Sequence, residues 1–212
     1  GVLLSGKSYT FDESHATVYV FHNDNYICVG LDMVDPALAF NELSNVWQND
    51  GVELYIDGDY SRKATKDGNE FGFQATVQGD GATSAGNNPP TPIAIGSAAK
   101  YKEAGYNGNY STDGAYWDFG ARAWDDGTGY TVEWKVDKQM CLDPANIVKV
   151  GFDIGVNELD PGAADRTGKW AWWHFDADTG LRKDAWDDER GWGVLELLAT
   201  SQLPGVSDWQ MF

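Results

Sequence analysis

A tryptophan and a carboxylate that could together bind a sugar stand close in sequence, at Trp47 and Glu53. The flat ring of Trp47 can stack on the C–H face of a pyranose, and Glu53 can accept hydrogen bonds from its hydroxyls. The alternative is that Trp47 closes the end of a hydrophobic core and that Glu53 is a solvated sheet residue, because most aromatic side chains belong to cores. The elements around Trp47 and Glu53 are needed to distinguish a sugar-binding role from a structural one.

The residues that follow Trp47 predict a β-strand with two different faces. Residues 52–57 alternate apolar and polar side chains, with Glu53, Tyr55 and Asp57 on the polar face. Residues 48–51, Gln-Asn-Asp-Gly, predict a turn before this strand. The turn would hold Trp47 at the edge of the carboxylate-bearing face.

The rest of the chain is typical of further short strands separated by turns. Asp125-Asp126-Gly127-Thr128-Gly129 predicts a hairpin between residues 115–124 and 130–136. Further strands are expected at residues 16–21, 26–31, 71–78, 148–157, 170–175 and 192–199. This pattern predicts an all-β fold, an antiparallel β-sandwich of the jelly-roll or immunoglobulin-like kind. We expect a single domain, 1–212, with a long inserted loop at about residues 79–113.

The strand expected at residues 148–157 carries glycines on its polar face. Gly151 and Gly155 flank Asp153 there, while the other face is apolar. Glycine inside a strand often marks the close approach of a ligand or of another backbone. The alternative is that a bulky side chain from a neighbouring strand fills the space, and the sequence leaves both open.

Composition narrows the classes of partner and compartment. A net charge of −18 repels phosphate backbones, which argues against nucleic acid as a partner. No apolar run reaches the length of a membrane span. Ten Trp and ten Tyr with few basic residues favour a secreted or cell-surface carbohydrate-handling protein, whose leader has been removed or which is a piece of a longer chain. Cys28 and Cys141 fit two buried thiols or a disulfide.

Acidic turns offer oxygen ligands for Ca²⁺. Asp57 and Asp59 lie in one such turn, and Asp160 opens another that continues to Asp165. Neither turn has the ligand spacing of an EF-hand loop. We expect calcium as a structural ion at these residues; the alternative is that the turns are simply solvated.

Several motifs in a fixed order resemble one known family. They lie at residues 16–20, 25–27, 35–36, 47–57, 129–133, 150–157, 185–186 and 192–197. Their order is similar to that of the family 9 carbohydrate-binding modules, within the broader group of sandwiches that includes the DOMON domains. The resemblance covers roughly residues 16–198 and implies a β-sandwich that binds sugar and carries structural Ca²⁺.

The resemblance also implies specific roles for side chains. Members of the family clamp a terminal sugar ring between two Trp residues, and Trp47 and Trp186 fall at these positions. Glu53 falls at an acidic hydroxyl acceptor, and Arg166 falls near a family arginine.

Two positions depart from the family pattern and bear on the identity of the sugar. Gln74 stands where a sugar-binding member carries an arginine, and Lys183 stands where an amide is expected. Both remain candidate ligand-binding residues.

The expected function is therefore non-catalytic binding of the end of a β-glycan such as xylan or cellulose fragments. The ligand would be an oligosaccharide or polysaccharide. The module would hold a covalently linked or partner glycoside hydrolase on its substrate.

An enzyme is the first alternative, as a secreted glycoside hydrolase or lyase with carboxylates on the sheet face. Glu53 and Asp57 are about 13 Å apart along one strand, beyond the roughly 5–9.5 Å that glycosidases use. Glu53 would need Asp153 or Glu133 from another strand.

The second alternative is a heme-binding, DOMON-like electron-transfer domain. Such a domain needs axial ligands, for which Met33, Met140 and His174 are available. Their surroundings in the sequence do not distinguish them from packing or solvated residues.

Overall fold

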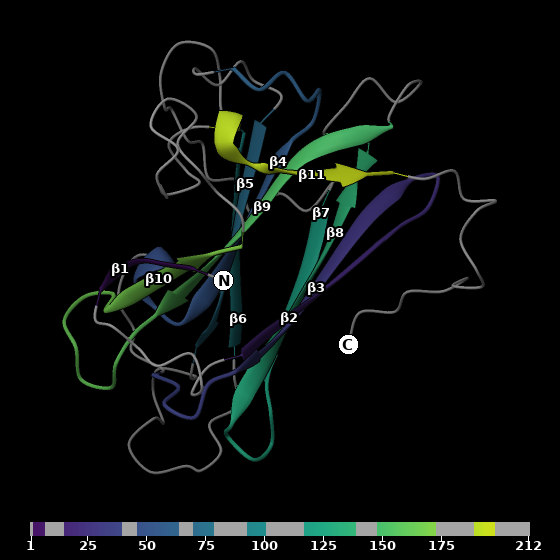
Figure 1. Ribbon diagram of the computed structural model, residues 1–212. Coiled ribbons are helices and arrows are strands. Elements are labelled where there is room, and N and C mark those ends of the chain that lie inside the picture. The colour runs from purple at the N-terminus through teal and green to yellow at the C-terminus, as the bar shows by residue number, and fades with distance from the viewer. Residues whose placement is uncertain are drawn as a thin grey trace.

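The chain folds as two antiparallel sheets packed face to face (Figure 1). A computed structural model describes residues 2–6, 15–39, 46–63, 70–78, 93–100, 117–138, 148–172 and 189–197. The predicted all-β antiparallel sandwich is confirmed.

The larger sheet has β4 and β9 at its centre. Its strands are β1 (Val2–Gly6), β4 (Gly51–Asp57), β5 (Glu70–Gln78), β6 (Ile93–Lys100), β9 (Lys149–Glu158), β10 (Gly168–Ala171) and β11 (Gly193–Glu196). The order is β1-β10-β9-β4-β5-β6, and β11 also pairs with β9. β10 and β11 share one edge of β9, because β10 pairs with residues 155–158 and β11 with residues 149–152.

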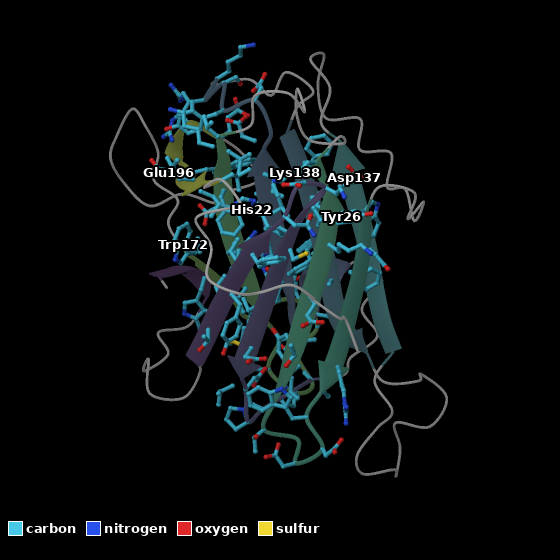
Figure 2. The ribbon with its side chains drawn as sticks, turned by 90° about the vertical axis from the view of Figure 1, so that its right-hand side faces the viewer. His22, Tyr26, Asp137, Lys138, Trp172 and Glu196 are labelled. Carbon is cyan, nitrogen blue, oxygen red and sulfur yellow. The ribbon has the colours of Figure 1, made fainter. Side chains whose placement is uncertain are left out.

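The smaller sheet is built from two hairpins that pair with each other along one strand of each. It contains β2 (His15–His22), β3 (Tyr26–Val34), β7 (Trp117–Ala123) and β8 (Gly129–Asp137) in the order β2-β3-β8-β7. Asn23 closes the β2–β3 turn, since its side-chain oxygen accepts hydrogen bonds from the backbone N–H groups of Asn25 and Tyr26. His22 and Lys138 meet at this end of the sheet, with Nδ1 and Nζ 3.2 Å apart (Figure 2).

The hydrophobic core lies between the two sheets. Alternate residues of β4, such as Leu54 and Ile56, face Trp134 and Val132 of β8 across it, and all four are fully buried. The period-two pattern in the sequence therefore identified the core face correctly, because successive strand side chains point to opposite sides.

The segment between residues 79 and 113 differs from the sequence prediction. Ile93–Lys100 form β6, which pairs with β5 along its whole length. The prediction of one uninterrupted loop is therefore wrong for these residues. The run Ile-Ala-Ile-Gly-Ser-Ala-Ala lacks strong strand formers beyond its first residues, so pairing with β5 rather than propensity determines the strand.

Within the described residues, no helix is both long and apolar enough to span a membrane. Cys28 is a free, buried thiol, and burial raises its pKa to about 11. Cys141 lies outside the described residues.

Replacing Leu54 by Ala should lower the free energy of unfolding by about 2–5 kcal/mol, because it opens a cavity in the centre of the core. Val148→Ala, at a side chain that is 67% exposed, serves as the control and should change it by less than about 0.5 kcal/mol. Urea denaturation measures both, and equal effects would contradict the placement of the core.

Candidate functional site

Trp47 lies in a short helical turn that leads into the central strand. The turn is η1 (Val46–Gln48), and it directly precedes Asn49, Asp50 and β4. The Trp47 side chain is half-buried, and the Arg166 guanidinium carbon lies 5.3 Å from its ring centroid. Gln48 Nε2 donates to Asp165 Oδ1 over 2.9 Å. These contacts hold the tryptophan against the loop that follows β9.

Glu53 is buried on the outer face of the larger sheet, where three hydrogen-bond donors hold its carboxylate. Lys169 Nζ donates to Oε2 over 2.5 Å, and Asn157 Nδ2 donates to Oε1 over 3.0 Å. The Tyr55 hydroxyl also donates to Oε2. The side chain is 2% exposed. Its carboxylate is therefore fixed in position.

The electrostatics of Glu53 favour its charged form. Burial by itself would raise its pKa, but the charge of Lys169 and the hydrogen bonds from Lys169, Tyr55 and Asn157 outweigh burial and hold the pKa below its usual value. The group is a stable carboxylate at neutral pH.

Arg166 connects the tryptophan to this buried network. Its Nη1 donates to Asn157 Oδ1 over 2.8 Å and lies 3.9 Å from Glu53 Oε1. The structure thus brings Trp47, Glu53 and Arg166 together, from a turn, a strand and a loop. A half-buried aromatic ring, a guanidinium and an amide meet at one place.

Gln74 also belongs to this face. It lies directly opposite Glu53 in the β4–β5 register and is half-buried. Directly opposite side chains on one sheet face have Cβ atoms about 4.5–5.5 Å apart. Lys183 and Trp186 lie outside the described residues.

The glycines of β9 make room for neighbouring side chains. A Cβ on Gly155 would lie 3.0 Å from Lys169 Cε, and a Cβ on Gly151 would lie 2.8 Å from Asp57 Cβ. Of the two explanations that the sequence left open, the bulky-neighbour explanation is the one the structure supports. Gly155 lets Lys169 reach across β9 to Glu53.

Sequence reasoning missed Lys169 as part of this site. Lys169 pairs with Asn157 in the β9–β10 register, and its side chain is only 1% exposed. The sequence shows a lone lysine before an aromatic run, which is typical of a solvated strand end. Only the pairing of β10 with β9 places it beside a carboxylate.

The structure separates Glu53 from one of the two carboxylates that an enzyme could have paired with it. Glu53 is on the outer face of the larger sheet, whereas Glu133 alternates with the core residues Val132 and Trp134 and so faces outward from the smaller sheet. Asp153 shares a face with Glu53, but its Oδ1 accepts the Ile154 N–H over 2.8 Å. Glu53 is already neutralised by Lys169.

The heme-binding alternative is not supported by the position of Met33, the first of its candidate axial ligands. Met33 is 3% exposed and packs in the hydrophobic core between the sheets. Met140 and His174 lie outside the described residues.

The acidic residues expected to bind calcium lie at opposite ends of the sheet. Asp57 pairs with Gly151 near the start of β9, whereas Asp160 follows the end of β9. Asp57 accepts the N–H groups of Ser61 and Arg62 over 3.2 Å, and the exposed Asp59 accepts the N–H of Ser61 over 3.0 Å. The turn at Asp57 and Asp59 is thus stabilised by its own backbone, and Asp160 cannot share an ion with it.

A different group of carboxylates gathers near Trp47. Oxygens of Asp35, Asp50 and Glu158 all lie within 4.8 Å of one another, and all three residues are buried. Burial raises the pKa of Asp35. Burial, followed by the charges of Asp35 and Glu158, raises the pKa of Asp50 well above its usual value. Burial, followed by the charges of Asp35 and Asp160, raises the pKa of Glu158 to about 8.

Comparison with known proteins gives the family of the chain. A search of curated proteins found no match. Two structures of a family 9 carbohydrate-binding module from Caldicellulosiruptor kristjanssonii have the same fold, each with a TM-score of 0.60 and 19% identity. The complex with cellotriose matches over 99% of this chain and 88% of that one, and the complex with glucose over 92% and 82%.

The sequence profile of the carbohydrate family 9 binding domain-like family matches residues 2–200. This match covers nearly the whole chain and agrees with the resemblance found in the sequence. The protein therefore belongs to the carbohydrate family 9 binding domain-like family, whose members are non-catalytic binding modules.

Proposed function

We propose that the chain binds the terminal sugar ring of a β-glycan, with Trp47 as one wall of the binding slot. The observation that carries this proposal is the half-buried Trp47 ring beside Arg166, which is anchored to the buried Asn157. A flat apolar surface next to fixed polar groups suits a pyranose, which has C–H faces and hydroxyl edges.

Among the described residues beside Trp47, Arg166 is the charged group that we expect to contact sugar hydroxyls. The Arg166 side chain is 19% exposed, while that of Glu53 is only 3% exposed. Glu53 therefore acts mainly by holding Asn157, whose side-chain oxygen in turn positions the Arg166 guanidinium before the sugar arrives. Pre-organisation of this kind raises affinity because fewer side chains lose freedom on binding.

The remaining predicted residues would complete the slot. Trp186 would supply the second aromatic wall, and Lys183 and Gln74 would contribute polar contacts at its rim. Gln74 fits this role because it lies beside Glu53 on the same sheet face.

The solved complexes support cellulose-derived sugars as the first ligands to test. The similar structures from Caldicellulosiruptor kristjanssonii contain cellotriose in one case and glucose in the other. We propose cello-oligosaccharides and the related xylo-oligosaccharides as the ligand class of this chain.

In its biological setting the module would keep a glycoside hydrolase on its polysaccharide. The hydrolase would be covalently linked or a partner, and both would be secreted or at the cell surface. Binding one module to the substrate raises the effective concentration of the linked enzyme there.

Replacing Trp47 by Ala should lower the affinity for cellotriose by about 30-fold or more, because a central aromatic contact is typically worth at least about 2 kcal/mol. Isothermal titration calorimetry with cellotriose and xylotriose measures the effect. Tyr19→Ala removes a 48% exposed aromatic from the other sheet and is the control. Unchanged affinity in a folded Trp47→Ala variant would refute the proposed slot.

Removing one member of the Glu53–Lys169 pair should destabilise the fold more than removing both. Glu53→Gln or Lys169→Met leaves a buried charge without its partner, which costs about 3–5 kcal/mol. The double variant leaves no such charge, so its loss should be smaller than the sum of the single losses. Urea denaturation of the four proteins measures this, and simple additivity would contradict the pair.

The contribution of Glu53 to the stability of the fold should be lost at acidic pH. Its pKa in the folded protein is below the ordinary value of 4.5, so its stabilising effect is complete above that pH and is lost as the pH falls through the folded-state pKa. The difference in unfolding free energy between the wild type and Glu53→Gln should therefore shrink in acid. A difference that stays constant down to strongly acidic pH would contradict this.

A further inference from the structure

Strand β2 forms one edge of the smaller sheet and has an unusual composition for an edge strand. Among the described strands it pairs with β3 alone, through eight consecutive residue pairs without a bulge. Its sequence, His-Ala-Thr-Val-Tyr-Val-Phe-His, contains no Asp, Glu, Lys, Arg, Gly or Pro. Charged residues, prolines and bulges are features by which edge strands avoid pairing with other chains, and β2 has none of them.

The other edge of the same sheet is protected in the usual way. β7 contains the exposed residues Asp118 and Arg122, and Gly120 lies between them. In Figure 2 the purple strands β2 and β3 form one side of this sheet, and the teal strands β7 and β8 form the other. The lack of charge in β2 is therefore not a general property of the sheet.

Both sides of β2 carry apolar side chains, although the strand is partly exposed. Val18 and Val20 point toward the core side of the sheet, because they pair with the core residues Leu31 and Val29 of β3. Tyr19 points to the opposite side. Tyr19 is 48% exposed and Val20 is 38% exposed. A further strand beside β2 would cover part of both side chains, because directly opposite side chains contact each other on each side of a sheet.

We propose that β2 pairs in antiparallel orientation with β2 of a second copy of this chain, with Tyr19 at the centre of the pairing. The two copies would be related by a two-fold axis, as in most symmetric dimers. The two four-stranded sheets would then form one continuous sheet of eight strands. The outward-facing backbone N–H and C=O groups of β2 would gain hydrogen-bond partners in the other copy.

The sequence of β2 is complementary to itself in this register. Tyr19 would lie opposite Tyr19 of the second copy on one side of the sheet, and Thr17 would lie opposite Phe21. On the other side, Val18 would lie opposite Val20. Aromatic and β-branched pairs of this kind stabilise antiparallel strands. These pairs make a second copy, rather than an unrelated strand, the partner that fits β2.

Charge also favours β2 as the place where two copies meet. The chain carries a net charge of −18, so two copies repel each other in most orientations. Pairing through β2 places no carboxylate of one strand against the other strand. The contact is limited to eight residues, a length of about 26 Å, and small interfaces give weak complexes. We therefore expect a weak dimer that forms as the protein concentration rises through the micromolar range.

A dimer of this kind would present two Trp47 sites to one polysaccharide. Two linked sites retain a protein on a multivalent ligand better than one site does, without any new contact to the sugar. This consequence rests on the proposed function, whereas pairing through β2 does not. Self-association is therefore measured without sugar, so that its failure and the failure of sugar binding are separate results.

Sedimentation velocity of the whole chain, from low to high micromolar concentration, tests the pairing. The wild type should shift from monomer to dimer as the concentration rises. Tyr19→Glu places two like charges opposite each other at the two-fold axis and should weaken association by about tenfold or more. Val194→Glu adds the same charge at a 41% exposed strand residue of the larger sheet and should leave association unchanged. A monomer at every concentration, or full association of folded Tyr19→Glu, would overturn the proposal.

The effect of salt distinguishes this pairing from an interface held by ion pairs. Raising the NaCl concentration from about 10 mM to about 150 mM shortens the Debye length from about 30 Å to about 8 Å. Association should become stronger, because salt screens the repulsion between two acidic chains and leaves the apolar and backbone contacts of β2 in place. Association that becomes weaker with salt would contradict pairing through an uncharged strand.

Cross-linking tests the register directly. Tyr19→Cys should form a covalent dimer with a short bis-maleimide, because the two substituted positions would lie opposite each other. Thr17→Cys should react far less, because its two positions would be separated by four residues along the pairing, about 13 Å. The wild type treated in the same way gives the background from the native cysteines. Equal cross-linking of the two variants, or none above background in either, would overturn the pairing centred on Tyr19.

Discussion

The ion pair between Glu53 and Lys169 is the contact on which the site depends. Both residues of the pair are almost fully buried, with Nζ and Oε2 2.5 Å apart. A single buried charge would be strongly unfavourable, so each residue requires the other. The pair also needs the register that places Gly155 beside Glu53, because a larger side chain there would block Lys169. Arg166 and Asn157 then take fixed positions around the carboxylate.

The central strand β4 is buried on both of its faces, and this makes the outer face unusual. Every residue of β4 is buried, including Glu53 and Asp57. Trp192 contributes to this cover by packing on Tyr55, with ring centroids 5.5 Å apart. A covered polar face must satisfy its charges internally, whereas an open one can leave them to water. The outer face is therefore a rigid polar layer suited to orienting side chains at its rim.

Glu53 and the cluster of Asp35, Asp50 and Glu158 are all buried, but their pKa values are shifted in opposite directions. Lysine and hydrogen bonds lower the pKa of Glu53, whereas burial and neighbouring carboxylates raise the pKa of Glu158 to about 8. Glu53, whose charge is compensated and whose oxygens are hydrogen-bonded, fits a pre-organised binding site. It stays deprotonated at neutral pH and so has no proton to donate in acid–base catalysis. Trp47 lies in η1, shortly before Asp50 in the sequence, and the Arg166 guanidinium carbon lies 5.3 Å from its ring centroid.

The sequence by itself determined the fold class, the main strands and the core face, because alternation with a period of two is a local property of the chain. It also pointed to Trp47, Glu53 and Arg166 as candidate sugar-binding residues, and the structure places these three side chains close together. Only the tertiary structure decided that Lys169 neutralises Glu53, that Ile93–Lys100 form a strand, and that Asp35, Asp50 and Glu158 meet. These features depend on strand pairing between residues far apart in the sequence, and pairing register leaves no local pattern.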